Sequence, residues 1–339
     1  MLLVAGAPEL DHHDAGPGHP ERAERVRAAL GGLSDAGLQD AMMPLEPRRA
    51  TFEELSRVHP VPYLEALRAF CEAGGGALDP DTVAGPGSWD TALLAAGGVL
   101  AAVDGLQAGA GEAAFVAARP PGHHALSDQP MGFCLLNNVA VAAAALAERG
   151  ERVAVVDWDV HHGNGTQEIF WDDPRVLYVS THQWPLYPGT GALSDTGGTR
   201  SPGTTINVPL PAGATGDVLL EAFDGVVAEA MEDFVPTWVL VSAGFDAHRA
   251  DPLAGLSLSA ADFGALARRV RGFAPGPGRV VAVLEGGYDL DALRLSAGAT
   301  AAALMGVEFL PEASTSDGPG AEVLPAVRLA RLEALGLGP

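Results

Sequence analysis

The sequence contains no lysine, so all 20 of its basic side chains are arginines. Without a lysine amine the chain cannot form a Schiff base, anchor pyridoxal phosphate or build a lysine-dependent P-loop. Its two cysteines, Cys71 and Cys134, are too few for a disulfide framework or a cysteine-ligated structural zinc site. These absences exclude several kinds of cofactor chemistry and of covalent scaffold.

Positive charge is also scarce, because 43 acidic residues give a formal net charge of -23. This balance disfavours nucleic acid, whose phosphates attract arginine and lysine, and mildly favours cationic substrates. The apolar run at 2–7 is too short for a signal peptide and has no basic segment before it. We expect no membrane span, because glycine and charge interrupt the alanine-rich runs. The sequence therefore predicts a cytoplasmic protein that binds neither nucleic acid nor membrane.

Short apolar runs alternate with amphipathic segments from about residue 113 onward, and 47% of all residues are apolar. Uniformly apolar strands between helices indicate an α/β fold with a parallel sheet covered on both faces. The predicted strands are 2–5, 113–118, 153–156, 176–180, 205–208, 238–241 and 280–284. The predicted helices are 19–30, 60–72, 88–106, 135–148, 166–171, 217–234, 260–273, 290–304 and 324–335.

We find no internal repeat and no linker before about residue 312, which favours one domain over residues 1–312. The stretch 311–320 is rich in Ser, Gly, Pro and acidic residues and is expected to be loose. We assign residues 313–339 to a C-terminal tail with a short helix.

Polar clusters follow four of the predicted strands at their carboxyl ends, where parallel sheets bind ligands. The clusters are 119–124 (RPPGHH), 157–165 (DWDVHHGNG), 242–246 (SAGFD) and 285–288 (EGGY). One such cluster is ordinary, whereas four at the same edge of a sheet are hard to obtain by chance.

The cluster 157–165 places two carboxylates and two imidazoles within six residues. We predict that Asp159, His161 and Asp246 bind a divalent metal, since three protein ligands with an open position form the pattern of catalytic zinc. Two carboxylates would also suit Fe(II), Co(II) or Mn(II). The alternative is that Asp159 and His161 are only hydrogen-bonded loop residues.

Two adjacent histidines, His123 and His124, stand where a hydrolase needs acid–base groups. Such a ring needs its far nitrogen held by a partner, and Asp157 and Asn164 are the candidates. Paired histidines taken alone more often form a hydrogen-bonded loop.

Tyr288 follows two glycines, and its hydroxyl could stabilise an oxyanion beside the metal. Phe133, after Gly132, and Tyr187 could wall an apolar channel. Each of these aromatic residues, if isolated, would be a packing residue.

The motifs RPPGHHA, GFCLLNNVAVAA, DWDVHHGNGTQEIF, YPGTG, NVPLPAG, SAGFDAHRADPLAGL and LEGGYDL occur together and in this order. They resemble the histone deacetylase family of zinc amidohydrolases, which includes bacterial histone deacetylase-like amidohydrolases and acetylpolyamine amidohydrolases. The resemblance covers roughly residues 10 to 305. It implies an arginase-like three-layer fold around a parallel eight-stranded sheet, with a catalytic domain over residues 1–312.

The implied reaction is the removal of an acetyl or other acyl group from acyl-lysine or a related small-molecule or peptide amide. An acetylpolyamine deacetylase is the alternative. A non-catalytic acyl-lysine binding module and a binuclear manganese ureohydrolase are less favoured, because no catalytic motif is lost and only one ligand set is present. A homo-oligomer is compatible with this assignment.

The resemblance also implies a role for each residue of the motifs. His124 matches the general base and acid, His123 its electrostatic partner with Asp157 behind it, and Tyr288 the carbonyl-polarising tyrosine. Asp159, His161 and Asp246 match the zinc ligands. Gly132, Phe133, Tyr187 and Leu253 fall on the acyl-lysine tunnel, and Arg22 resembles an arginine near an internal acetate channel.

Family members also bind structural potassium. Asp157, Asp159, His161, Ser180 and Thr181 match one potassium site. Phe170, Asp173 and Val176 match a second, built mostly from backbone carbonyls.

Two positions distinguish subgroups of the family. Asn164 is typical of class II and bacterial members, and a neutral partner should leave His124 less basic than a carboxylate would. Leu253 stands where polyamine-specialised animal members have Glu, which favours an acyl-lysine or uncharged amide. His162 has no predicted role beyond packing.

Overall fold

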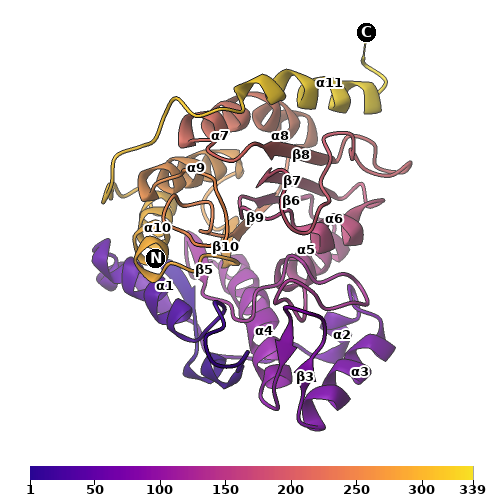
Figure 1. Ribbon diagram of the computed structural model, residues 1–339, viewed down its shortest axis with the longest axis vertical. Helices are drawn as coiled ribbons and strands as arrows, with labels where there is room; N and C mark the ends of the chain where they lie inside the picture. The colour runs from indigo at the N-terminus through magenta and orange to yellow at the C-terminus, as the bar shows by residue number, and fades with distance from the viewer. Residues whose placement is uncertain (339) are drawn as a thin grey trace.

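The chain, described over residues 1–338 in a computed structural model, folds around a parallel eight-stranded sheet flanked by helices (Figure 1). This confirms the predicted architecture. In spatial order the strands are β2 (Met42–Pro44), β1 (Leu2–Ala5), β5 (Ala113–Val116), β10 (Val280–Leu284), β9 (Trp238–Ala243), β6 (Val153–Asp157), β7 (Val176–Gln183) and β8 (Thr205–Leu210). A small antiparallel hairpin, β3 (Gly76–Ala77) and β4 (Val83–Ala84), lies apart from it.

Eleven α-helices are present among the described residues. They are α1 (Glu24–Asp35), α2 (Phe52–Leu55), α3 (Val61–Glu72), α4 (Ser88–Gln107), α5 (Asn138–Glu148), α6 (Asn164–Phe170), α7 (Gly216–Ala222), α8 (Ala228–Phe234), α9 (Ala260–Phe273), α10 (Leu290–Leu304) and α11 (Leu324–Ala334). Shorter turns are 3-10 helices at Pro8–His12, Gln39–Ala41 and Ala321–Val323, and a π-helix at Phe223–Val227.

The sheet separates two hydrophobic cores, because successive strand side chains point to opposite faces. In β6, Val153 and Val155 belong to the core beneath α3, α4 and α5. Ala154 and Val156 belong to the core beneath α1 and α7 to α11. This double burial explains why the strands are apolar throughout rather than alternating.

The structure differs from the predicted elements at several places, among them the helix expected at 19–30, which runs from Glu24 to Asp35, and helix α2, which was not predicted. The edge strand β2 was not predicted, because three partly exposed residues carry too little pattern. The single helix expected at 217–234 is interrupted by the π-helical turn, where Gly225 has non-helical angles (φ -104, ψ -107). Helix α5 begins at Asn138 rather than 135, because the Asn137 side chain caps it by accepting the Ala140 amide.

Helix α4 corrects the expectation about membrane spans. Its 20 residues are long and apolar enough to cross a membrane by length and composition. However, 67% of its apolar window is buried inside the fold, where it packs in the core beside α5. Core burial accounts for this composition.

The segment 311–320 has no regular structure, yet the expectation that it is loose is wrong. The Glu312 carboxylate accepts hydrogen bonds from His248 and the Ala260 amide, and Thr315 is bonded to Asp262. Helix α11 then packs beside β8 at one edge of the molecule (Figure 1). The division of the chain at residue 312 stays a prediction.

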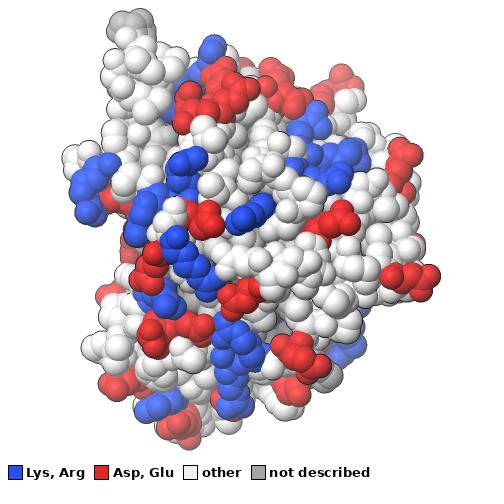
Figure 2. All heavy atoms as spheres, turned by 180° about the vertical axis from the view of Figure 1, so that it is seen from behind, with Lys and Arg blue, Asp and Glu red and all other residues white. Residues whose placement is uncertain are grey.

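Arginines on the face seen in Figure 2 lie among acidic side chains rather than in a separate basic patch. Many arginines of the chain are paired with carboxylates distant in sequence, including Arg149 with Asp104 and Arg269 with Asp224. Such exposed pairs contribute little to stability, but they neutralise the few positive charges that the chain has.

Candidate active site

The four polar clusters meet at one edge of the sheet. They follow β5, β10, β9 and β6, which are consecutive neighbours in the strand order. Because all four strands are parallel, their carboxyl ends share that edge, and residues more than a hundred positions apart become adjacent.

The predicted metal ligands lie together. One ligand atom each from Asp159, His161 and Asp246 falls within 4.8 Å of the others. His161 Nδ1 is 3.2 Å from Asp159 Oδ1 and 3.1 Å from Asp246 Oδ2. The second carboxylate oxygens are held by backbone amides, that of Asp159 by Gly286 at 2.8 Å and that of Asp246 by Val160 at 2.9 Å. Both carboxylates are therefore fixed with one oxygen turned toward the imidazole.

The electrostatics of this trio favour a cation. Burial, and then the neighbouring Asp159 charge, raises the pKa of the Asp246 carboxyl. Burial alone would lower the pKa of His161, but the hydrogen bonds that its ring donates to Asp159 and Asp246 raise it to about 10. Two carboxylate oxygens and one imidazole nitrogen, gathered where positive charge is stabilised, fit a divalent metal.

The adjacent histidines have different hydrogen-bond partners, a carboxylate and a side-chain amide, and their pKa values are shifted in opposite directions. His123 Nδ1 lies 3.0 Å from Asp157 Oδ2, and His124 Nδ1 lies 2.7 Å from Asn164 Oδ1. Burial would lower the pKa of His123, but Asp159 and Asp157 raise it to about 10. Burial, followed by the positive charges of His123 and His161, holds the pKa of His124 well below its ordinary value. His123 is thus the charged ring and His124 the neutral one.

The tautomer of His124 follows from its partner. The Asn164 amide nitrogen points toward Met131 Sδ at 3.2 Å, so its oxygen faces His124. His124 must then donate from Nδ1, which leaves Nε2 unprotonated as a base.

Glu285 is a buried acid whose role the sequence did not reveal. Its carboxylate accepts the amides of Gly122 at 2.6 Å and His123 at 3.1 Å, and the hydroxyl of Ser242 at 3.2 Å. Burial raises its pKa to about 7 despite the positive charge of His123. Glu285 therefore ties the loop that carries His123 and His124 to β9 and β10. In the sequence, the one feature that could have pointed to Glu285 is its position just before two glycines.

The prediction for Arg22 is wrong, because that side chain is exposed. Arg25, three residues later, is fully buried and donates from Nε to the Gly287 carbonyl at 2.7 Å. It also donates to the Glu285 carbonyl, and its guanidinium lies 4.8 Å from the centre of the Tyr288 ring. Arg22 lies just before α1, whereas Arg25 lies in its first turn and faces the core.

A tunnel of about 210 Å³ leads to this constellation. It is lined by Asp81, His124, Gly132, Phe133, His161, Leu186, Tyr187, Leu253 and Tyr288. Tyr187 and Leu253 are 38% and 37% exposed, so they lie at its mouth. Every residue predicted for the tunnel wall is among them, whereas Asp81 and Leu186 were missed because no motif marks them.

Gly132 leaves room for the base. Its φ of +56 is left-handed, and a Cβ there would overlap the His124 ring. Phe133 also adopts a left-handed φ of 67, and its ring lies 5.8 Å from that of Tyr288, edge to face. This strained turn at Gly132 and Phe133 places the Phe133 ring against the Tyr288 ring.

His162 does more than pack. Its two ring nitrogens lie 2.8 Å from Thr190 Oγ1 and 3.0 Å from Gln167 Oε1. Burial and the neighbouring His182 lower its pKa to about 2, so the ring is neutral. Thr190 follows Tyr187 closely in sequence, so His162 anchors the loop that carries this tunnel residue.

The residues of the first predicted potassium site also gather. Asp157, the last residue of β6, is the register partner of Ser180 within β7, and Ser180 Oγ lies 2.9 Å from His182 Nδ1. The Thr181 hydroxyl is buried without a hydrogen-bond partner among the described residues.

The residues of the second predicted potassium site form the turn between α6 and β7. The Phe170 carbonyl accepts the Asp173 amide, and the Asp173 carbonyl accepts the Val176 amide. Both potassium sites stay predictions.

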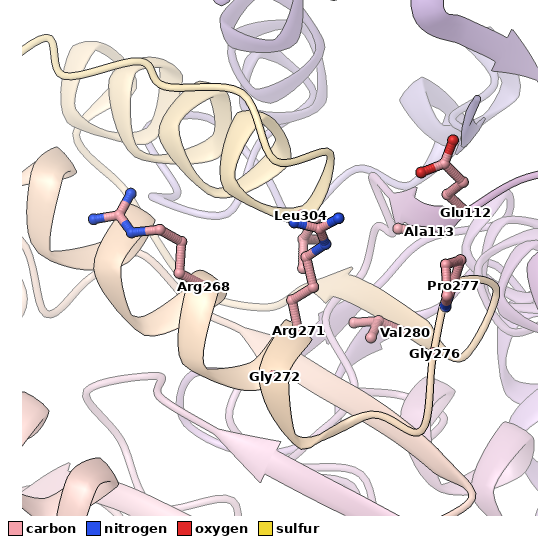
Figure 3. Close-up of a pocket in the computed structure, with 9 residues that line it drawn as sticks. All are labelled: Glu112, Ala113, Arg268, Arg271, Gly272, Gly276, Pro277, Val280 and Leu304. Carbon is pink, nitrogen blue, oxygen red and sulfur yellow. The ribbon is translucent and has the colours of Figure 1, made fainter.

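A larger hollow, of about 430 Å³, lies at the opposite end of the sheet (Figure 3). Ala113 and Val280, at the amino ends of β5 and β10, line it together with Arg268, Arg271 and Glu112. Within residues 1–338 the only group with metal-ligand geometry is the trio described above. The chemistry therefore belongs to the smaller tunnel.

The chain is similar to several known proteins. A family model described as histone deacetylase domain matches residues 19–304. A histone deacetylase-like amidohydrolase of Pseudomonas aeruginosa is 44% identical over 279 residues, covering 81% of this chain and 73% of that protein. A probable deacetylase of Archaeoglobus fulgidus is 41% identical over 284 residues, covering 82% and 79%.

Solved structures agree with these sequence matches. The crystal structure of the HDA15 HD domain superposes with a TM-score of 0.91 at 35% identity, covering 99% of this chain and 98% of that one. The fold is thus the arginase/deacetylase fold, and the chain belongs to the histone deacetylase family of deacetylases and amidohydrolases.

Proposed function

We propose that this family member is a zinc-dependent deacylase that removes acetyl, or another short acyl group, from acyl-lysine. The observation that carries the proposal is the convergence of three groups on the floor of one narrow tunnel. These are the metal-binding trio, the neutral base His124 and the Tyr288 hydroxyl. A volume of about 210 Å³ is below the usual range for drug-sized ligands and suits a single acylated side chain.

Zinc, when bound by Asp159, His161 and Asp246, would polarise the amide carbonyl and lower the pKa of water; Fe(II) or Co(II) could serve likewise. His124 accepts the proton of the attacking water at Nε2, since Nδ1 is committed to Asn164. It then returns this proton to the departing amine.

Tyr288 and His123 supply the electrostatic part of catalysis. The Tyr288 hydroxyl donates to the carbonyl oxygen as that atom gains negative charge. His123, held charged by Asp157, adds positive potential beside the reacting carbon.

An acetylpolyamine deacetylase is the second candidate, and one residue favours it. Asp81 places a carboxylate on the tunnel lining, where it could meet a cationic chain. Leu253 at the mouth argues for the peptide, because it offers no charge. We also propose that potassium binds beside Asp157 and Ser180, which the register pairing of these two residues in β6 and β7 supports.

A substrate panel tests the proposal. Acetyl-, trifluoroacetyl- and longer acyl-lysine peptides would be compared with acetylputrescine and acetylspermidine on zinc-loaded protein, with Asp246→Ala as the inactive control. We expect peptide kcat/KM to exceed polyamine kcat/KM. If polyamine kcat/KM exceeded peptide kcat/KM, the proposed substrate would be an acetylpolyamine and not acyl-lysine. No turnover of any amide by fully zinc-loaded protein would refute the proposed function.

A further inference from the structure

The loop between β9 and α9 carries three residues of the active site. Asp246 is a metal ligand, Leu253 lies at the tunnel mouth, and Asp251 accepts the Tyr288 amide at 2.6 Å. The two legs of this loop are joined by backbone hydrogen bonds, from Arg249 to the Leu258 carbonyl at 2.9 Å and from Leu258 back to residue 247 at 3.1 Å. The shape of the loop therefore affects the ligand, the mouth and the tyrosine together.

Glu312 holds this loop from outside the matched domain, which ends at residue 304. One carboxylate oxygen accepts from His248 Nε2 and from the Ala260 amide, both at 2.8 Å, and the other pairs with Arg249. Ala260 is the first residue of α9, where a free amide and the helix dipole both favour a carboxylate. The side chains of His248 and Glu312 are only 4% and 16% exposed, so their contact is shielded from water, whereas Arg249 is 45% exposed.

A continuous series of hydrogen bonds leads from Glu312 to Tyr288. His248 Nδ1 accepts the Ala250 amide at 3.1 Å, so the ring donates to Glu312 from Nε2. The His248 carbonyl accepts the Asp251 amide at 2.9 Å, and the Asp251 carboxylate then accepts the Tyr288 amide. Removing Glu312 would leave the His248 ring with the Ala250 amide as its one remaining hydrogen-bond partner within residues 1–338.

The segment that bears Glu312 has its own attachment. The Thr315 hydroxyl donates to Asp262 at 2.8 Å and accepts the Gly216 amide at 2.8 Å. A change at Glu312 therefore releases the loop without detaching the segment.

We propose that Glu312 is a positioning residue: through His248 and Asp251 it sets the placement of Tyr288 and of the Leu253 side of the tunnel. The C-terminal segment is thereby part of the catalytic unit. This inference rests on the proposed deacylase function for its kinetic readout, but not for its structural one.

The kinetic test compares Glu312→Ala, Glu312→Gln and the control Glu308→Ala in zinc-loaded protein. Glu308 lies in the same segment, is exposed and makes no hydrogen bond or ion pair within residues 1–338. We expect Glu312→Ala to lower kcat about tenfold, with a smaller rise in KM, because small misplacements of catalytic groups are costly. Glu312→Gln keeps an acceptor oxygen for His248 and Ala260 and should stay within about twofold of wild type.

The same comparison is repeated in a Tyr288→Phe background. If Glu312 acts through the Tyr288 hydroxyl, Glu312→Ala should lower kcat little further there. An equal fold-loss in both backgrounds, or unchanged kcat in Glu312→Ala, would overturn the proposal.

Hydrogen exchange provides a readout that needs no substrate. In Glu312→Ala, amides of residues 249–258 and 286–289 should exchange faster, while those of the central strands keep their wild-type rates. Unchanged exchange in the loop would also overturn the proposal. Absence of turnover in the wild type would refute the deacylase function and leave this exchange result as the test of Glu312.

Discussion

Replacing Tyr288 by Phe should separate catalysis from stability. The Tyr288 hydroxyl has no hydrogen-bond partner within residues 1–338, whereas its ring packs 4.8 Å from the Arg25 guanidinium and 5.8 Å from Phe133. A phenyl ring fills the same space and leaves no protein group unsatisfied. The free energy of unfolding should therefore change by less than about 1 kcal/mol, since no intramolecular hydrogen bond is lost.

The catalytic effect should be much larger. Loss of one oxyanion donor raises the barrier by about 2.7–4 kcal/mol, which is about 10²–10³-fold in kcat. KM should change little, because the hydroxyl acts mainly on the charge that develops in the transition state. Steady-state kinetics on an acetyl-lysine peptide, with zinc content measured on the same samples, would provide the numbers.

Tyr63→Phe is a matched control with the opposite signature. The Tyr63 hydroxyl donates to the Leu135 carbonyl at 2.6 Å, away from the metal-binding trio. Its loss should cost about 0.5–1.5 kcal/mol of stability while kcat stays near wild type. A Tyr288→Phe enzyme within threefold of wild-type kcat, at equal zinc content, would refute the role assigned to this hydroxyl.

Three further variants probe the metal site and the buried charges. Asp246→Asn should lose bound zinc, measured by metal analysis, and its melting temperature should no longer fall when a chelator is added; stoichiometric zinc would exclude Asp246 as a ligand. In Gly286→Ala the new Cβ would overlap carboxylate oxygens of Asp246 and Asp159, so zinc affinity should fall at least about tenfold in a competition titration. Glu21→Gln tests acid stability: burial alone would raise the pKa of Glu21, but His13 and two arginines lower it from 4.5 to about 2. Because folding lowers this pKa, the ionised Glu21 carboxylate contributes about 3 kcal/mol to the free energy of unfolding. This contribution is present above the unfolded pKa and is lost as the pH falls toward 2. The free energy of unfolding is measured with urea near pH 5 and near pH 3. Between these two pH values the wild type should lose about 2 kcal/mol more of this free energy than Glu21→Gln does, and equal losses would contradict the assignment.

The sequence by itself determined the fold class and pointed to the polar side chains that the structure brings together. The clusters after β5, β6, β9 and β10 could be placed at one edge before the strand order was known, because every parallel strand presents its carboxyl end there. Asp159 and His161 could likewise be assigned to one site, because they lie two residues apart within one of these clusters. These inferences depend on local pattern alone.

Tertiary structure decided which side chain faces which. Arg25, not Arg22, reaches the Tyr288 loop, because α1 begins at Glu24 and its rotation about its axis is set by packing against α10. Strand β2 was missed because it is short and lies at the edge. Glu312 looked like part of a loose tail, since its partners His248 and Ala260 are more than fifty positions away. Hydrogen bonds between such distant residues leave no periodic signal in the sequence, and they form only when the sheet and its helices bring the segments together.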